Sequence, residues 1–195
     1  MIFVFLFRPE EWKIDAQDGS ITIRDKQIHW VHTDRNQVRC VSNEKMIKGD
    51  FTHSFVVCLK EGYIEDQKNR GLIRLWEIRN DWDNRVWVYV RLTMNGWTIH
   101  SEQRNMTKDI WAYHGNHVFP FGDRFIVKMM RDNECYRLQV IEEQTKMVLE
   151  DSKWINGINT TFNWIWLVSS IRSRRNNDNW STGYIENFCI NNSNR

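Results

Sequence analysis

The sequence predicts an all-β fold, an antiparallel sandwich, on the strength of three observations. Apolar and polar residues alternate with a period of two, and no segment keeps a 3.6-residue period for three helical turns. Asn, Asp and Gly stand between the alternating segments, where tight turns need them. Neither an internal repeat nor a change of composition divides the 195 residues. We therefore expect about a dozen short strands in one β-sandwich domain over residues 1–195.

The first expected strand is the apolar run of residues 1–7, which ends at Arg8 and Pro9. A secretory signal would place a basic region before such a run and a small-residue cleavage site after it, and the sequence shows neither. We therefore expect a buried strand and a cytoplasmic protein, or an extracellular one if a leader has been removed.

The remaining strands are expected in chain order, each bounded by polar or turn-forming residues. Asn95-Gly96 stands between two of them and is the strongest hairpin signal in the chain. The expected strands are residues 20–23, 27–32, 51–60, 72–79, 86–93, 97–102, 124–131, 136–141, 147–150, 162–169 and 183–191.

Composition excludes several classes of protein. The chain is 41% hydrophobic and 27% charged, which excludes disorder, and no apolar run approaches the roughly 20 residues of a membrane-spanning helix. The net charge of +2 does not indicate a nucleic-acid partner, so the basic cluster at residues 172–175 is expected to be a solvated loop. Phosphate loops and nucleophile elbows are missing, which excludes cofactor enzymes. We expect neither a nucleic-acid nor a membrane partner.

The cysteines and histidines give weak metal signals. The spacing of the four cysteines is not of the zinc-binding type; they are Cys40, Cys58, Cys135 and Cys189. We expect each of them to be a small buried hydrophobic residue. Alternatively, they form two disulfides if the compartment is oxidising.

His114 and His117 could chelate with Asp123, but solvated loop histidines are the expectation. The Asn- and Asp-rich residues 81–84 and 176–179 could hold calcium and are equally typical of turns. We expect no metal site and no cofactor, with calcium left open.

One strand face carries the most suggestive chemistry. The valines of residues 86–93 are expected to face inward, so Trp87, Tyr89 and Arg91 face outward. Sugars stack on aromatic rings while their hydroxyl groups bond to polar neighbours, which this face would supply. The expected ligand-binding residues are Arg74, Trp76, Trp87, Tyr89, Arg91, Trp97, His100 and Trp111.

The same aromatic residues have a second interpretation. They could pack beneath the segment 105–120, or form an interface with a second copy of the chain or another protein. Sugar binding predicts partly exposed tryptophans in a groove, whereas a protein interface predicts a flatter apolar patch and a stable oligomer.

Three stretches resemble the concanavalin A-like lectin/glucanase superfamily, a jelly roll of two curved antiparallel sheets. Residues 9–23 resemble its entry of a Trp followed by a short strand, and residues 48–55 (KGDFTHSF) resemble its strand that begins at Gly-Asp-Phe. Residues 182–190 (TGYIENFCI) resemble its closing strand, with Glu186 where Asp is usual. The resemblance frames nearly the whole chain and implies the fold rather than an activity.

Most members of this superfamily bind or cleave carbohydrates, and some hold calcium. Its hydrolases place two carboxylates on one strand face, about 5–5.5 Å apart in retaining enzymes. The nearest candidates, Glu77 with Asp81 and Asp83, and Glu142 with Glu143, do not reproduce that spacing. The function expected is therefore a non-catalytic carbohydrate-recognition domain that binds an oligosaccharide. A protein-interaction or oligomerisation domain is the alternative, ahead of a glycoside hydrolase.

Overall fold

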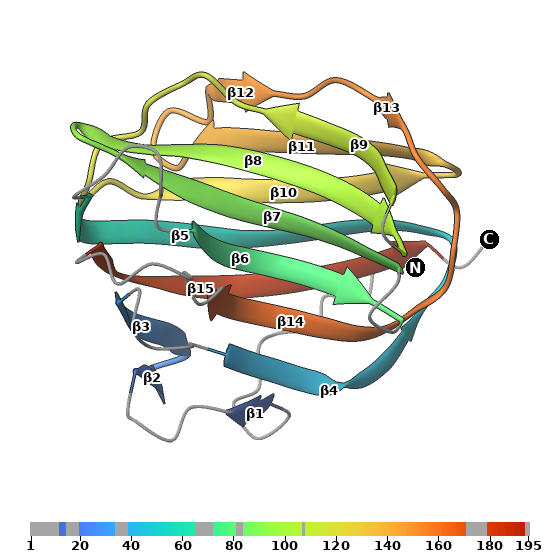
Figure 1. Cartoon of the computed structure of the whole chain (residues 1–195), viewed down its shortest axis with the longest axis horizontal. Coiled ribbons are helices and arrows are strands. Elements are labelled where there is room, and N and C mark those ends of the chain that lie inside the picture. Colours follow the sequence, from blue (N-terminus) through green and yellow to red (C-terminus); the bar gives the residue numbers. More distant parts are fainter. Residues whose placement is uncertain are drawn as a thin grey trace.

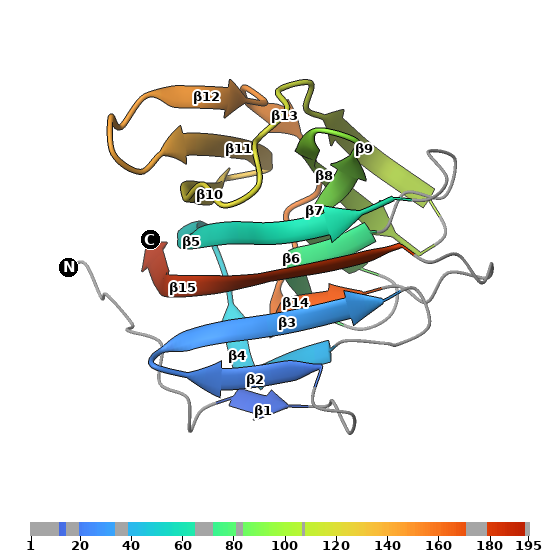
Figure 2. The ribbon, with the colours of Figure 1, turned by 90° about the vertical axis from the view of Figure 1, so that its left-hand side faces the viewer.

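The computed structural model describes residues 12–14, 20–33, 39–64, 72–80, 84–106, 108–170 and 179–193. These residues form two antiparallel sheets stacked face to face, and none of them lies in a helix (Figure 1). Figure 2 shows the same two layers after a quarter turn. The sequence-based prediction of an all-β antiparallel sandwich is confirmed.

The first sheet has seven strands and faces the viewer in Figure 1. Its spatial order is β1 (Trp12–Ile14), β4 (Arg39–Ile47), β14 (Phe162–Ser170), β6 (Leu72–Arg79), β7 (Asn84–Thr93), β8 (Gly96–Asn105) and β9 (Lys108–His114). We call the side of this sheet that is turned away from the second sheet the outer face.

The second sheet has eight strands and lies behind the first. Its order is β12 (Val148–Asp151), β11 (Cys135–Glu142), β10 (Phe125–Asp132), β5 (Asp50–Tyr63), β15 (Trp180–Ser193), β3 (Gln27–Thr33) and β2 (Ile21–Arg24), and β13 (Ile155–Asn156) pairs with β11. The long strands β5 and β15 pair at its centre.

The core lies between the sheets and is built from the inward residues of both. Val86, Val88 and Val90 of β7 are fully buried, as their alternation predicts. From the second sheet, Phe55 and Val127 join the same cluster. Burial of these side chains is the main force that holds the layers together, at roughly 1.5–3 kcal/mol for each large apolar residue.

Most strands lie where the sequence predicts them, with ends that differ by a few residues. Two longer strands were not predicted. β4 has a polar sequence (RCVSNEKMI) without clear alternation, and β9 contains only a short apolar stretch. Both segments form strands because they pair with neighbouring strands. β4 pairs with β1 and β14, and β9 pairs with β8. The strand expected at residues 1–7 lies outside the described residues.

A pair of β-bulges interrupts the alternation in the middle of the seven-stranded sheet. In β6, Arg74 pairs with Tyr89 and Trp76 with Val88, so Leu75 is an extra residue. Next to it in β14, Val168 has a positive φ of 52° at a break in the pairing with β4. As a result, Leu75 and Trp76 both face the core, although they are consecutive.

Candidate functional site

The outer face of the seven-stranded sheet gathers charged and aromatic side chains in cross-strand rows. One row places Trp87 of β7 between Glu77 of β6 and Glu102 of β8. In the next row Tyr89 lies between Arg74 and His100. Residues directly opposite in antiparallel strands lie about 4.5–5.5 Å apart, so each row brings its side chains into contact.

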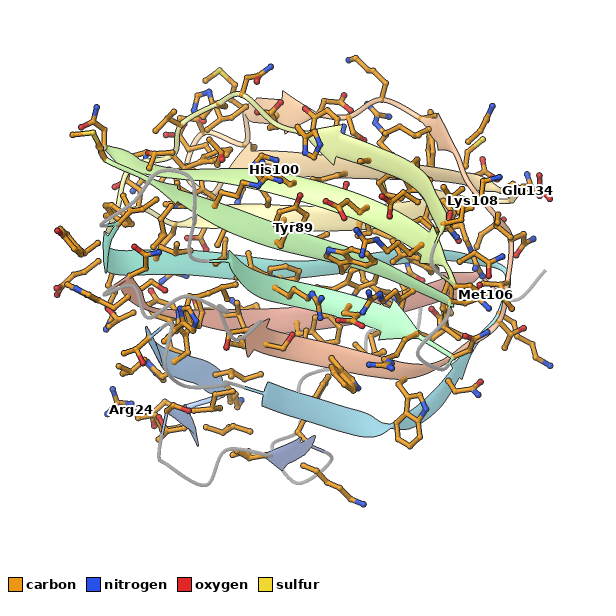
Figure 3. The ribbon with its side chains drawn as sticks, in the orientation of Figure 1. Arg24, Tyr89, His100, Met106, Lys108 and Glu134 are labelled. Atoms are coloured by element: carbon orange, nitrogen blue, oxygen red, sulfur yellow. The ribbon has the colours of Figure 1, made fainter. Side chains whose placement is uncertain are left out.

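Tyr89 is at the centre of a hydrogen-bonded network on this face. Its ring stacks on the imidazole of His100, with centroids 5.1 Å apart and planes inclined by 21°. Its hydroxyl donates to a carboxylate oxygen of Glu102 and accepts a hydrogen bond of 3.1 Å from Arg91. Burial raises the pKa of Tyr89, and its hydrogen bond to Glu102 raises it further. Figure 3 shows Tyr89 and His100 side by side on β7 and β8.

His100 connects this network to a second histidine on β9. Its Nδ1 lies 3.3 Å from Nδ1 of His114, and its Nε2 lies 2.8 Å from the hydroxyl of Thr98. Only one of the two Nδ1 atoms can carry the proton that joins them. His100 is buried and His114 is exposed, so the pair extends from the buried surface of the sheet to solvent.

A groove of about 760 Å³ opens beside these residues. Arg91, Thr98, His100 and His114 contribute side chains from the sheet, and the β7–β8 turn and the segment after β9 form its rim. The rim includes exposed apolar groups, among them Met94 with 76% of its surface accessible. The groove therefore offers hydrogen-bonding groups on its sheet side and apolar contacts at its edge.

Glu77 and Trp87 lie further along the same face. Glu77 is fully buried and forms ion pairs with Arg74 at 3.0 Å and Arg79 at 3.7 Å. Trp87 is only 4% exposed, because guanidinium groups cover its ring. Arginine side chains therefore cover the Trp87 ring in this structure, and a sugar cannot stack on it.

The structure brings together five of the eight sequence-predicted binding residues. Arg74, Trp87, Tyr89, Arg91 and His100 share the outer face, as their alternation along β6, β7 and β8 predicts.

The other three, Trp76, Trp97 and Trp111, do not join them and lie in the core between the sheets. For these three, the prediction of a shared binding face is wrong, and the packing interpretation describes them.

Each of the three tryptophans has a physical reason to face inward. The bulge at Leu75 reverses the alternation after Arg74, which turns Trp76 toward Val88. Trp97 pairs with Leu92 across the β7–β8 hairpin, and Trp111 of β9 donates a hydrogen bond of 2.9 Å to the buried amide of Gln103.

Several residues of this face were not among the predicted ligand-binding residues, although His114 was named as a possible metal ligand. They are Thr98, Glu102 and Arg104 of β8, Arg85 of β7, His114 of β9 and Trp166 of β14. A signal existed for the first group, because Thr98, Glu102 and Arg104 alternate with His100 in steps of two along β8. Arg85 precedes Trp87 by two residues and carries the same signal, whereas the positions of His114 and Trp166 depend on which strands pair.

The structure tests part of the predictions about metal binding and hydrolysis. The ring of His117 packs at a tilt against that of Phe119, and His114 pairs with His100 instead of with His117. Within the described ranges there is no group of three or more His, Cys, Asp or Glu side chains that could hold a metal ion. Residues 81–83 and 176–178, named for calcium, lie outside those ranges, so calcium stays a prediction.

The candidate carboxylates in the described residues each contact another group. Glu142 accepts a hydrogen bond from Thr145 and Glu143 pairs with Arg124, while Glu77 is buried between two arginines. Asp81 and Asp83 lie outside the described residues.

Cys58, Cys135 and Cys189 are free thiols, and burial raises the pKa of Cys58 and Cys189. No helix in the described part of the chain is long and apolar enough to cross a membrane.

Comparison with solved structures identifies the fold. An alginate lyase from Klebsiella pneumoniae superposes with a TM-score of 0.70 at 8% identity, over 92% of this chain and 86% of that one. The carbohydrate-binding module CBM66 from Bacillus subtilis gives 0.59 at 11% identity, over 93% and 95%. The basic winged bean lectin with Tn-antigen gives 0.60 at 11% identity, over 97% and 98%.

These similarities confirm a concanavalin A-like jelly roll, the fold that the closing and opening motifs of the sequence resemble. No protein-family model matches the sequence, and no curated protein matches it. Because the sequence identity to these structures is only 8–11%, the similarity shows the fold alone.

Proposed function

We propose that this protein binds an oligosaccharide on the outer face of its seven-stranded sheet, in the groove beside Tyr89 and His100. The observation that carries the proposal is that groove of about 760 Å³, where Arg91, Thr98, His100 and His114 present donors and acceptors next to apolar groups. A sugar needs both kinds of partner, since its hydroxyl groups require hydrogen bonds and its C–H faces require apolar contact.

The comparisons support a carbohydrate ligand in general terms. Proteins of this fold include a carbohydrate-binding module and a lectin bound to Tn-antigen, and also an alginate lyase. We favour binding without catalysis, because the carboxylates on the outer face are committed to other groups: Glu77 to Arg74 and Arg79, and Glu102 to Tyr89.

The binding mode differs from the one that the sequence suggested. Trp87 is covered and cannot stack on a sugar as the structure stands. The contacts available in the groove are hydrogen bonds from His114, Thr98 and Arg91, with Met94 and Val118 at the rim. Orientation would then come from the polar groups, and the apolar rim would exclude water from them.

Isothermal titration calorimetry against a panel of neutral and acidic tetrasaccharides tests the proposal. We expect saturable binding of at least one glycan class, weakened about tenfold or more by His114→Ala, which removes an exposed groove residue. His117→Ala is the matched control, since His117 is also exposed but does not line the groove. Absence of binding to every glycan would overturn the proposal, and chain cleavage during the titration would show an enzyme instead.

A further inference from the structure

Three arginines from three strands surround the ring of Trp87. The guanidinium carbons of Arg74, Arg85 and Arg104 lie 5.4, 4.7 and 5.5 Å from its centre. Arg85 and Arg104 are also directly opposite each other in the β7–β8 pair. Like charges in this position repel each other, and cation–π contacts with a single ring offset only part of that cost.

The positive charge of this cluster is incompletely balanced. Arg74 has Glu77 as its partner, and Arg104 has Asp109. Arg85 forms no ion pair with any residue that the structure describes, and its buried Nε has no hydrogen-bond partner there. Burial lowers the pKa of Arg85, and the charges of Arg74 and Arg104 lower it further. The carboxylates of Glu77 and Glu102 oppose this lowering of the pKa. An anion placed here would relieve the repulsion and supply the missing acceptor.

A second cation lies along the same strand, in the groove. Arg91 donates to the hydroxyl of Tyr89 and forms no ion pair within the described residues. Arg85, Trp87, Tyr89 and Arg91 alternate on one side of β7, so the two free charges are roughly 20 Å apart at 3.3–3.4 Å per residue. Two separated cations on one face match a chain that carries repeated negative charges.

We propose that the glycan bound by this protein is acidic, with one anionic group between Arg85 and Arg104 and another at Arg91. This inference rests on the proposed function and names its ligand class. Guanidinium groups bind carboxylate and sulfate groups through paired N–H donors, so either a uronate or a sulfated sugar has the required chemistry.

Matched ligands separate charge from sugar shape. Tetragalacturonate and tetramannuronate would be titrated beside their carboxyl-reduced forms, tetragalactose and tetramannose, and beside a heparin-derived tetrasaccharide. We expect at least one acidic tetrasaccharide to bind tenfold or more tighter than its neutral counterpart. Preference for a uronate identifies the carboxylate as the recognised group, and preference for the heparin fragment identifies sulfate.

Matched variants locate the recognition. Arg85→Gln should weaken binding of the acidic tetrasaccharide about tenfold, equal to 1.4 kcal/mol, and leave neutral sugars unaffected. Arg24→Gln removes the same charge from β2 of the other sheet, far from Tyr89 in Figure 3, and should have no effect. Thermal unfolding of both variants confirms that they fold.

Several outcomes would overturn this inference. If the neutral tetrasaccharides bind as tightly as the acidic ones, the groove binds glycans but does not select for charge, and the proposed function survives. If no tetrasaccharide binds, both proposals fail. Equal effects of Arg85→Gln and Arg24→Gln would reveal non-specific attraction, and equally tight binding of a single-stranded oligonucleotide would show a preference for polyanions rather than for glycans.

Discussion

Glu77 shows how one buried carboxylate can organise a charged surface. Arg74 and Arg79 would repel each other across the outer face without the negative charge between them. Glu77 is fully buried, so its attraction to both arginines is screened little by solvent. The carboxylate thus holds Arg74 close to Trp87, where it contributes to the arginine cluster.

Glu77→Gln is predicted to destabilise the protein by roughly 3 kcal/mol, because it removes the charge that compensates two partly buried arginines. Glu143→Gln is the control, since the Arg124–Glu143 pair is exposed and its loss should cost less than about 1 kcal/mol. Urea unfolding measures both free energies. Equal losses would mean that the buried carboxylate contributes no more than a surface one.

Gly183 is a residue whose missing side chain matters. A Cβ there would lie 2.5 Å from the carbonyl oxygen of Cys58 and 2.5 Å from the ring of Trp30, neither of which can move easily. Gly183→Ala is therefore predicted to lower the free energy of unfolding by about 1–3 kcal/mol through overpacking. Thr182→Ala, at a partly exposed neighbour, should cost less, and similar midpoints for both variants in urea would refute the argument.

At the scale of strands, regular alternation was predictable and its interruptions were not. The outward positions of Tyr89 and His100 follow from the period of two, and so does the inward position of Trp97. Any two-residue turn in the β7–β8 hairpin pairs Trp97 with a residue on the Leu92 face, so its burial was predictable. The bulge at Leu75 is different, because it depends on how β6 pairs with β7 and β14, and this pairing is not local.

The composition of the outer face shows the same division. The run of Trp87, Tyr89 and Arg91 on β7 could be recognised as an outward row from the sequence. The contact of Arg104 with Trp87 could not, because Arg104 reaches the ring only through the register of β8. Consequently, the sequence predicted which of these residues share a face but assigned the proposed contact to an aromatic ring that is covered.

Arg131 connects strands at one end of the sandwich. Its Nε and Nη2 donate to the carbonyl oxygen of Gly49, before β5, and its Nη1 donates to that of Thr160, before β14. Arg131→Met keeps the length of the side chain and removes these donors, so we predict a loss of roughly 2 kcal/mol. Arg24→Met, at an exposed position, should change stability by less than about 0.5 kcal/mol. Equal values in urea unfolding would show that the link is unimportant.

For the whole molecule, two neutral histidines tie stability to pH. His53 lies between the sheets, where its Nδ1 accepts a hydrogen bond of 3.2 Å from Trp76 and its Nε2 lies 3.4 Å from the amide oxygen of Asn192. His32 is also buried, and its ring nitrogens have no partner among the described residues. Burial lowers the pKa of His53 to about 3 and that of His32 to about 4.

The sign of the effect follows from comparing folded and unfolded chains. In the unfolded chain each imidazole takes up a proton below its ordinary pKa of 6.5, whereas in the folded protein both remain neutral until pH 3–4. Stability is therefore fully present above pH 6.5 and is lost as the pH falls toward those lower values. At pH 5 each histidine costs about 2 kcal/mol, from 1.36 kcal/mol per unit of pKa difference.

Urea unfolding at pH 7 and pH 5 should thus show a loss of roughly 4 kcal/mol, and His53→Gln should reduce that loss by about half. The carboxyl of Asp151 does not produce the same effect in this range. The pKa of Asp151 lies well below its ordinary 3.8 because Arg137 donates to it, so its contribution is lost only as the pH falls below 3.8. If stability does not change between pH 7 and pH 5, the buried histidines are reached by solvent or protonated in the folded state. If His53→Gln loses as much stability as the unsubstituted protein, His53 is not the source of the pH dependence.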